Sequence, residues 1–246
     1  MKPVLMSLLA AAVLAQTPTD LKFEVASIRP SAEQNHNTSI YTGAGGIRTS
    51  NTSLHMLITT AYNARSFQIL DANGWIQDQR FDINAKIDDD ADAGFSQKAR
   101  MERLQVRLRN LLADRFQLKI REETRELPIY ALVIDKGSQH KMKISTSGNG
   151  STNTNESNGS GSFRGDGIKM SSLALHLSGT VGRTVLNQTG LADEIFAVDL
   201  KWSDGSTGEG PSVFTAVREQ LGLRLESKKG PVAVFVVERA AKPSEN

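Results

Sequence analysis

Residues Arg107–Asp135, RLRNLLADRFQLKIREETRELPIYALVID, decide the fold class of this chain. Leucines at helical spacing end at Phe116, and Leu118–Ile120 then alternates apolar and polar side chains. Ile129–Ile134 is almost continuously apolar, as in a strand that is covered on both faces. This order predicts a helix followed by two strands, and we interpret the charged residues Arg121–Glu126 between the strands as a hairpin turn.

A second copy of the pattern occurs at Phe214–Glu238, FTAVREQLGLRLESKKGPVAVFVVE. The similarity extends upstream, so that six predicted elements follow one another in the same order in both halves. Amphipathic units resemble one another by chance, but an ordered match of six favours an internal repeat. The predicted fold class is α+β, with two tandem β-α-β-α-β-β units, each a small mostly antiparallel sheet covered by two helices. The matched strands upstream are Gly46–Arg48 with Gly167–Lys169 and Phe81–Ile87 with Phe196–Trp202.

Local signals mark the ends of several elements. The hydroxyls of Thr52 or Ser53, of Ser96, of Ser171–Ser172 and of Ser212 precede apolar residues at helical spacing and are suited to cap four helices. The alternation in Phe81–Ile87 predicts a strand with one face in water. Residues 31–46 are polar and contain glycine, which predicts a loop.

The N-terminus, MKPVLMSLLAAAVLAQTPTD, has the features of a signal peptide. Lys2 is followed by a short apolar run, and small residues place cleavage after Ala15. The alternative is a buried N-terminal helix. The run is too short to span a bilayer, which takes about 20 apolar residues. We therefore expect a secreted protein, periplasmic or extracellular, that meets the membrane only through its cleaved signal peptide.

The predicted domains follow from these signals. Residues 1–15 form the signal peptide, and residues 16–144 form an N-terminal α+β unit with a leading strand. Residues 145–162, STSGNGSTNTNESNGSGS, are of low complexity and bury little apolar area, which predicts a flexible linker. Residues 163–246 form the C-terminal α+β unit.

Composition narrows the range of functions. The chain has 246 residues, a formal net charge of +2 and 39% hydrophobic residues, which suffices for a globular core. A nucleic-acid-binding protein needs a basic face, and no basic run is present. The chain has no cysteine, so it has neither disulfides nor thiolate ligands.

Short motifs distributed over the mature chain resemble a known family. The chain is similar to the uncharacterised "soil-associated" secreted protein family that is abundant in acidobacteria. The resemblance implies export and implies no activity, since the family is a domain of unknown function. Similar domains are attached to membrane metallopeptidases of the beta-lactam-sensor type, and the predicted element order also resembles the small domain that precedes secretin and TonB-receptor barrels. The motifs are Phe23–Pro30, Gly74–Trp75, Arg80–Ile83, Leu111–Phe116, Pro128–Leu132, Thr189–Leu191 and Gln220–Leu223.

Three aromatic residues at strand–loop junctions are candidate binding residues: Tyr62, Trp75 and Trp202. Exposed aromatic side chains anchor partners and ligands. The alternative is that they fill the core or its rim.

No catalytic group and no metal site is predicted. Asp88, Asp90 and Asp92 have the spacing of a calcium loop, but alanine stands where an EF-hand needs its glycine and its last glutamate, so we expect a solvated acidic loop. The sequence contains no Gly-x-Ser-x-Gly motif, and Gly43–Gly46 lacks the lysine of a phosphate loop. The four histidines, expected to lie on helix surfaces or to pack, form no local pair: His36, His55, His140 and His176.

The sequence therefore favours a secreted, non-catalytic binding or assembly domain without cofactor. Its partner is unknown, with another protein or self-assembly as the options and no role for nucleic acid. One alternative is an extracellular hydrolase whose site is assembled from distant residues. The other is a sensor domain for small molecules or cell-wall fragments.

Overall fold

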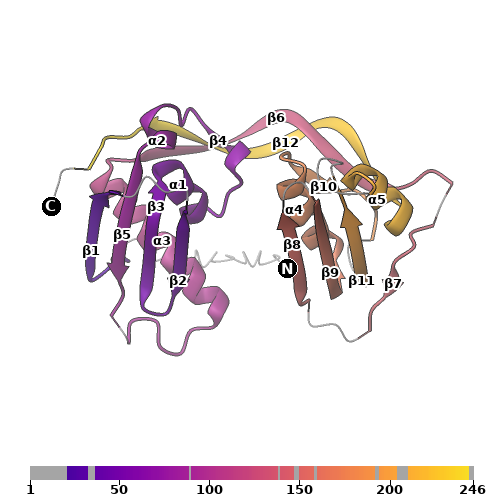
Figure 1. Cartoon of the computed structure of the whole chain (residues 1–246), viewed down its shortest axis with the longest axis horizontal. Coiled ribbons are helices and arrows are strands. Elements are labelled where there is room, and N and C mark those ends of the chain that lie inside the picture. Colours follow the sequence, from indigo (N-terminus) through magenta and orange to yellow (C-terminus); the bar gives the residue numbers. More distant parts are fainter. Residues whose placement is uncertain are drawn as a thin grey trace, which may run out of the picture. The chain divides into compact units, whose positions relative to one another are not determined.

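The computed structural model describes residues 21–32, 37–88, 90–137, 139–146, 150–157, 160–191, 194–203 and 210–243 (Figure 1). The predicted signal peptide lies outside these residues. Within them the chain is of mixed α+β type and forms two compact units. Of the described residues, unit 1 contains those up to Ser66, then those of Asp71–Ile120 and those from Val237 onward, and unit 2 contains those of Phe67–Leu70 and Arg121–Val236.

Unit 1 is built on sheet A, in which all strand pairs are antiparallel and the order is β1-β5-β3-β2. One face is covered by helices, where Phe116 at the end of α3 packs edge-on against Phe81 of β5 at 5.2 Å. Buried leucines of α1 and α3 complete this core, among them Leu57 and Leu112. The elements are β1 (Val25–Pro30), β2 (Ser39–Gly43), β3 (Gly46–Ser53), α1 (Leu54–Ala61), α2 (Trp75–Asp78), β5 (Arg80–Lys86) and α3 (Gln97–Arg115).

Unit 2 contains sheet C, which is also antiparallel and has the order β7-β11-β9-β8. Strand β11 alternates between buried residues such as Phe196 and Leu200 and exposed residues such as Asp199. The buried side chains form one core with Leu177 of α4 and Leu221 of α5. The elements are β7 (Lys143–Ile144), β8 (Thr152–Ser157), β9 (Ser160–Lys169), α4 (Met170–Thr180), β11 (Ile195–Trp202) and α5 (Val213–Leu221).

Three predicted helix caps are confirmed. Ser53 accepts a hydrogen bond from the backbone N–H of Met56, and Ser96 and Ser212 do the same for the residue three positions along. Each of these bonds satisfies one N–H group of a first helical turn that has no partner within the helix. The cap predicted at Ser171–Ser172 is wrong, because α4 begins at Met170 and its N-cap residue is Lys169, whose side chain makes no cap hydrogen bond.

The hairpins predicted at Arg121–Glu126 and at the equivalent place in the second copy are wrong. Each predicted strand pair is one long strand, β6 (Lys119–Ile134) and β12 (Leu223–Arg239). No glycine, proline, asparagine or aspartate lies within residues 121–126 to form a tight turn, and Gly230 of β12 has no positive φ. The absence of a side chain at Gly230 instead makes room for Ile129, whose Cδ1 would lie 2.7 Å from an added Cβ.

The long strands form the middle of sheet B, whose order is β10-β6-β12-β4, with β10 at Val185–Asn187 and β4 at Ile69–Leu70. Strand β10 pairs in parallel with β6, and β4, which follows the 3₁₀ turn η1 (Ser66–Gln68), pairs in parallel with β12. The two long strands run in opposite directions, since Lys119 contacts Glu238 at 2.9 Å and the Asp135 N–H donates to Gly222 O at 3.0 Å. Ile129, Val232, Val234 and Val236 form the core of this sheet.

Two segments predicted to be irregular form strands. Within the predicted linker, Thr152–Ser157 is β8 and Ser160 begins β9, and within the predicted loop at 31–46, Ser39–Gly43 is β2. Both β8 and β2 are edge strands. An edge strand needs little apolar area of its own, because pairing on one side satisfies half of its backbone groups while polar side chains stay in water. Composition therefore gave a misleading prediction for these two segments.

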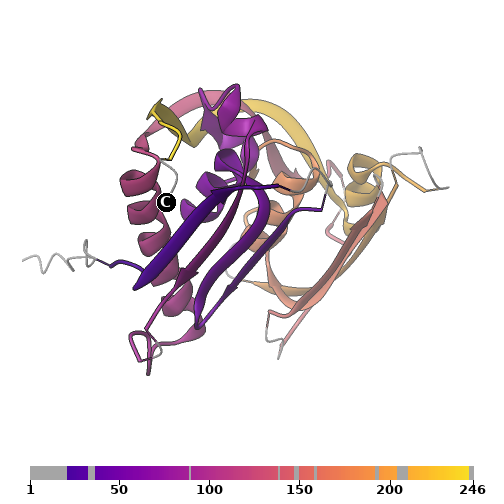
Figure 2. The same cartoon turned by 60° about the vertical axis from the view of Figure 1, so that its left-hand side comes forward.

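Each of sheets A and C has a face that none of the described helices covers. In Figure 2, α3 lies on one side of sheet A, while the other side of its strands is open. The residues of β5 that point to this side, Asn84 and Lys86, are exposed, whereas Ile83 and Ala85 are buried. No helix in the described part of the chain is long and apolar enough to cross a membrane.

Candidate functional site

The open face of sheet A presents a row of polar and aromatic side chains. The strand register places Tyr41 of β2 opposite Arg48 of β3, and Arg48 opposite Asn84 of β5. Adjacent strands lie about 4.8 Å apart, so the three side chains emerge next to one another on one face. All three are exposed, and Tyr41 retains 69% of its accessible surface.

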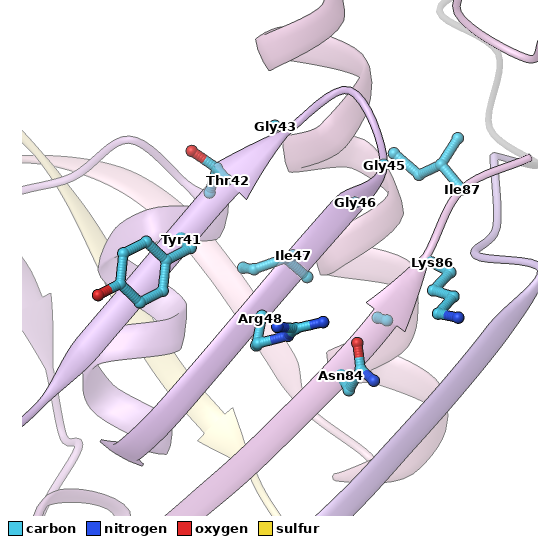
Figure 3. A pocket seen from close by; sticks show the side chains of 11 residues that line it. Tyr41, Thr42, Gly43, Gly45, Gly46, Ile47, Arg48, Asn84, Lys86 and Ile87 are labelled. Carbon is cyan, nitrogen blue, oxygen red and sulfur yellow. The ribbon is translucent and has the colours of Figure 1, made fainter. Parts of the chain in front are cut away.

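The next row of this face combines two glycines with a lysine. Gly43 of β2 lies opposite Gly46 of β3, and Gly46 lies opposite Lys86 of β5. Gly43 is exposed, whereas Gly46, which lies between Gly43 and Lys86, is buried, so that the backbone of this row is open at Gly43. The two rows line a shallow depression of about 660 Å³, seen in Figure 3 with the strands in front and a helix behind them.

The backbone at Gly46 requires glycine. Its φ is +122°, and a Cβ added there would collide with the Ala85 carbonyl oxygen of the neighbouring strand. Gly43 is different, because an added Cβ would meet no atom within 4 Å. The depression is therefore open above Gly43, and a larger side chain at this position would fill it without disturbing the sheet.

The polar side chains of this depression take no part in the polar interactions between described residues. Tyr41, Arg48, Asn84 and Lys86 make no side-chain hydrogen bond, ion pair or ring contact with any other residue in the described ranges. Nearby, Asp82 does have a structural role, since its carboxylate accepts a 2.8 Å bond from the Asn51 N–H. Two cations, an amide and a phenol are thus available to a ligand.

The open face of sheet C also carries an arginine and a lysine, but its arginine is paired with an aspartate. Arg164 of β9 donates to Asp199 of β11 from Nε at 3.1 Å and from Nη2 at 2.6 Å. The two lie in a smaller depression of about 250 Å³ together with Lys201. Here the guanidinium is neutralised by its neighbour, so that the open face of sheet A is the better candidate for binding a ligand.

The three aromatic residues predicted to bind lie elsewhere. Tyr62 follows α1 in unit 1 and has the guanidinium of Arg109 5.5 Å from its ring centroid. Trp75 begins the short helix α2 and is half-buried. Trp202 is only 7% exposed and belongs to the core of unit 2. The depressions on the open faces of sheets A and C include none of the three.

The acidic loop differs from its prediction as a solvated segment, because Asp92 is buried. Arg107 of α3 donates to both carboxylate oxygens of Asp92, and Arg103 donates to Oδ1 at 2.6 Å. The hydrogen bond from Arg107 and the second one from Arg103 lower the pKa of Asp92 from its ordinary value against the opposing effect of burial. This residue anchors the loop on α3, while Asp88 and Asp90 remain exposed.

The histidines pack or lie on helices, and His36 is outside the described residues. The ring centroid of His140 lies 5.1 Å from that of Phe196, and the ring centroid of His176 lies 4.5 Å from that of Phe163. Burial lowers the pKa of His55 on α1, partly opposed by a hydrogen bond involving Ser66. Within the described ranges, no three His, Asp or Glu side chains are grouped so as to hold a metal ion.

Sequence reasoning missed the residues of the depression, although part of the signal was present. The alternation in β5 places Asn84 and Lys86 on the wet face, as expected from the sequence. Tyr41 was not found, because its strand falls within a segment predicted to be a loop. The register that brings Tyr41 and Arg48 beside Asn84 depends on pairing between distant segments, which periodicity does not reveal.

Comparison with known proteins gives a family and no activity. A family described as "Protein of unknown function (DUF3738)" matches residues 55–240. No curated protein is detectably similar to the chain, and neither is any solved structure.

Proposed function

The chain belongs to the DUF3738 family of proteins of unknown function, and we propose that it is a non-catalytic binding module whose ligand-binding surface is the open face of sheet A. The observation that carries this proposal is the set of four exposed side chains around the glycine-lined depression. They make no side-chain hydrogen bond, ion pair or ring contact with another described residue, so that no polar interaction of the fold accounts for them. A wide, shallow face suits a ligand that lies across several strands.

The proposed binding surface is a face, so that binding does not depend on adding a strand. The backbone groups of β3 are already paired with β2 on one side and with β5 on the other. A ligand on this face must therefore be recognised by side chains. This feature favours a ligand rich in polar groups over an extended peptide that pairs through its main chain.

The two units are proposed to be copies of one ancestral unit. The orders β1-β5-β3-β2 and β7-β11-β9-β8 agree strand for strand, and α1 and α4 each follow the third strand in their order. The predicted last two strands of each copy correspond here to one long strand. A crystal structure in which the two sheets superpose together with α1 on α4 and α3 on α5 supports the duplication, and helices on opposite faces would contradict it.

Export and kinship with the soil-associated secreted family belong to the same proposal. Lys2, the apolar run after it and the small residues before Gln16 support export. Expression of the full chain in a bacterium, followed by fractionation and intact-mass measurement, tests it. The expected product is an exported protein that starts at Gln16, and a cytoplasmic product that retains Met1–Ala15 would contradict export.

The binding proposal is tested by a thermal-shift screen of the mature chain against soluble polymers and small molecules. A ligand that binds the native state raises the melting temperature. The matched variant is Gly43→Leu, which fills the depression and is expected to melt at the same temperature as the wild type. The proposal predicts a ligand that shifts the wild type and not this variant. If no compound shifts the wild type, or if every shift persists in Gly43→Leu, the open face of sheet A is not the binding surface.

A further inference from the structure

The open face of sheet A carries two positive charges that no described residue neutralises. Arg48 and Lys86 point to the same face from neighbouring strands and are diagonal neighbours, because Arg48 lies opposite Asn84, two residues before Lys86. Diagonal neighbours across antiparallel strands lie about 7–8 Å apart. The two cations therefore form a local positive site, in contrast to Arg164 on sheet C, which Asp199 neutralises.

The geometry points to an acidic polysaccharide as the ligand, and this inference rests on the proposed binding function. Carboxylates along the chain would meet the guanidinium of Arg48, which forms paired hydrogen bonds with a carboxylate, and the ammonium of Lys86. The exposed ring of Tyr41 offers a flat apolar surface to the face of a sugar ring, and its hydroxyl remains in water. The amide of Asn84 both donates and accepts, which matches sugar hydroxyls.

The glycine row makes room for this ligand beside the charges. Gly43 leaves the backbone exposed in the same row as Lys86, and an added Cβ there would meet no atom within 4 Å, so that a sugar ring can approach the sheet surface at this point. Tyr41 lies two residues before Gly43 on the same strand and face, which places the ring at the border of the bare area. The site thus presents the flat ring of Tyr41 on β2 and the cations Arg48 and Lys86 on β3 and β5.

Other polyanions fit the face less well. A nucleic-acid backbone carries a phosphate at every step and is bound by extended basic surfaces. Here two cations face the depression, and the chain has a net charge of only +2. An acidic peptide would supply the carboxylates but no flat polar ring for Tyr41, and if its main chain paired with the edge strand β2 it would lie beside the sheet and not over the depression.

The direct test is titration calorimetry of the mature chain with polygalacturonate. Its matched control is the same polymer with its carboxylates methyl-esterified, which keeps the sugar rings and removes the charge. The acid form is expected to bind, and the ester to bind at least about tenfold more weakly. Binding of the acid form is expected to weaken as salt rises to about 1 M, where the Debye length falls to about 3 Å.

Single variants assign the binding to the face. Arg48→Ala and Lys86→Ala are each expected to weaken polygalacturonate binding about 10- to 100-fold, as for loss of a hydrogen bond to a charged group. Lys201→Ala removes an exposed lysine from the open face of sheet C and is expected to leave the affinity unchanged. Melting curves of all variants confirm that each is folded.

The results of these experiments distinguish a wrong ligand class from a wrong binding surface. If the esterified polymer binds as tightly as the acid form, and Gly43→Leu abolishes both, the face binds glycans but the acidic class is wrong. Equal affinity for poly-glutamate or single-stranded DNA would show a general polyanion site and overturn the polysaccharide assignment. If Arg48→Ala, Lys86→Ala and Gly43→Leu all bind the acid polymer like the wild type, both this inference and the proposed binding surface fail.

Discussion

The guanidinium of Arg107 holds both carboxylate oxygens of Asp92, at 2.7 and 3.0 Å, in a place where water has almost no access. The two side chains retain 2% and 7% of their accessible surface. Arg103 donates to the same carboxylate, and its guanidinium also lies 4.4 Å from the ring centroid of Phe95. This network joins the loop after β5 to the first half of α3 and makes the loop part of unit 1.

Replacing Asp92 by asparagine is expected to be strongly destabilising. The amide keeps the size of the side chain but removes the charge, and Arg107 is then buried without a counter-ion. Breaking a buried ion pair in this way costs roughly 3–5 kcal/mol. Urea unfolding followed by circular dichroism measures the loss. The control is Asp90→Asn in the same loop, where the side chain is exposed and a change within about 0.5 kcal/mol is expected. Equal effects of the two substitutions would contradict the network.

The same pair predicts a dependence of stability on pH. Folding lowers the pKa of Asp92 below its ordinary value of 3.8, chiefly through the hydrogen bond from Arg107. The ionised carboxylate therefore stabilises the folded state fully above that ordinary value, and the contribution is lost as the pH falls through the folded pKa. Unfolding free energies of the wild type and Asp92→Asn, measured from neutral to strongly acidic pH, are expected to converge only below the ordinary pKa. A difference that is constant over this range would show that the charge is not responsible.

Three helix caps were predicted correctly because each depends only on residues that are close together in the sequence. The caps at Ser53, Ser96 and Ser212 depend on one hydroxyl and the N–H three residues later, so that the sequence alone locates them. The long strand β6 was missed for the opposite reason. Its charged middle, Arg121–Glu126, resembles a turn in composition, and only pairing with β12 keeps it extended.

The residues of the candidate site were predicted only in part, because the pairing register of three strands brings them together. Alternation in β5 gives the outward direction of Asn84 and Lys86 without their neighbours. The partners come from β2 and β3, which lie about forty residues earlier in the chain and pair by backbone hydrogen bonds that carry no residue-specific signal. Its residue type and its place at a strand end make Trp202 a candidate for binding, but the alternation of β11 directs it to the core.

Each unit is expected to depend on its own leucine core. Leu112 of α3 is fully buried in unit 1, and Leu221 of α5 is 2% exposed in unit 2. Leu112→Ala and Leu221→Ala are each expected to lower the free energy of unfolding by roughly 2–5 kcal/mol through lost burial and a remaining cavity. Denaturant unfolding of both variants measures this, with Leu175→Ala on the exposed side of α4 as the control. A loss below about 0.5 kcal/mol at Leu221 would contradict the core of unit 2.

Gly161 is expected to tolerate no side chain, because it lies against the indole of Trp202. A Cβ added at Gly161 would come within 2.6 Å of Trp202 Cε2, and closer still to Cζ2. The φ of Gly161 is not positive, so packing alone opposes the substitution. Gly161→Ala must therefore displace the indole, whose ring centroid also lies 5.9 Å from that of the His176 imidazole. Overpacking of this kind lowers the free energy of unfolding by about 1–3 kcal/mol. Urea unfolding measures the cost, and tryptophan fluorescence is expected to report the displaced ring.

The matched control is Gly43→Ala, where the added methyl group meets no atom within 4 Å and no loss of stability is expected. If Gly161→Ala is as stable as Gly43→Ala and leaves the fluorescence unchanged, the indole does not pack on Gly161.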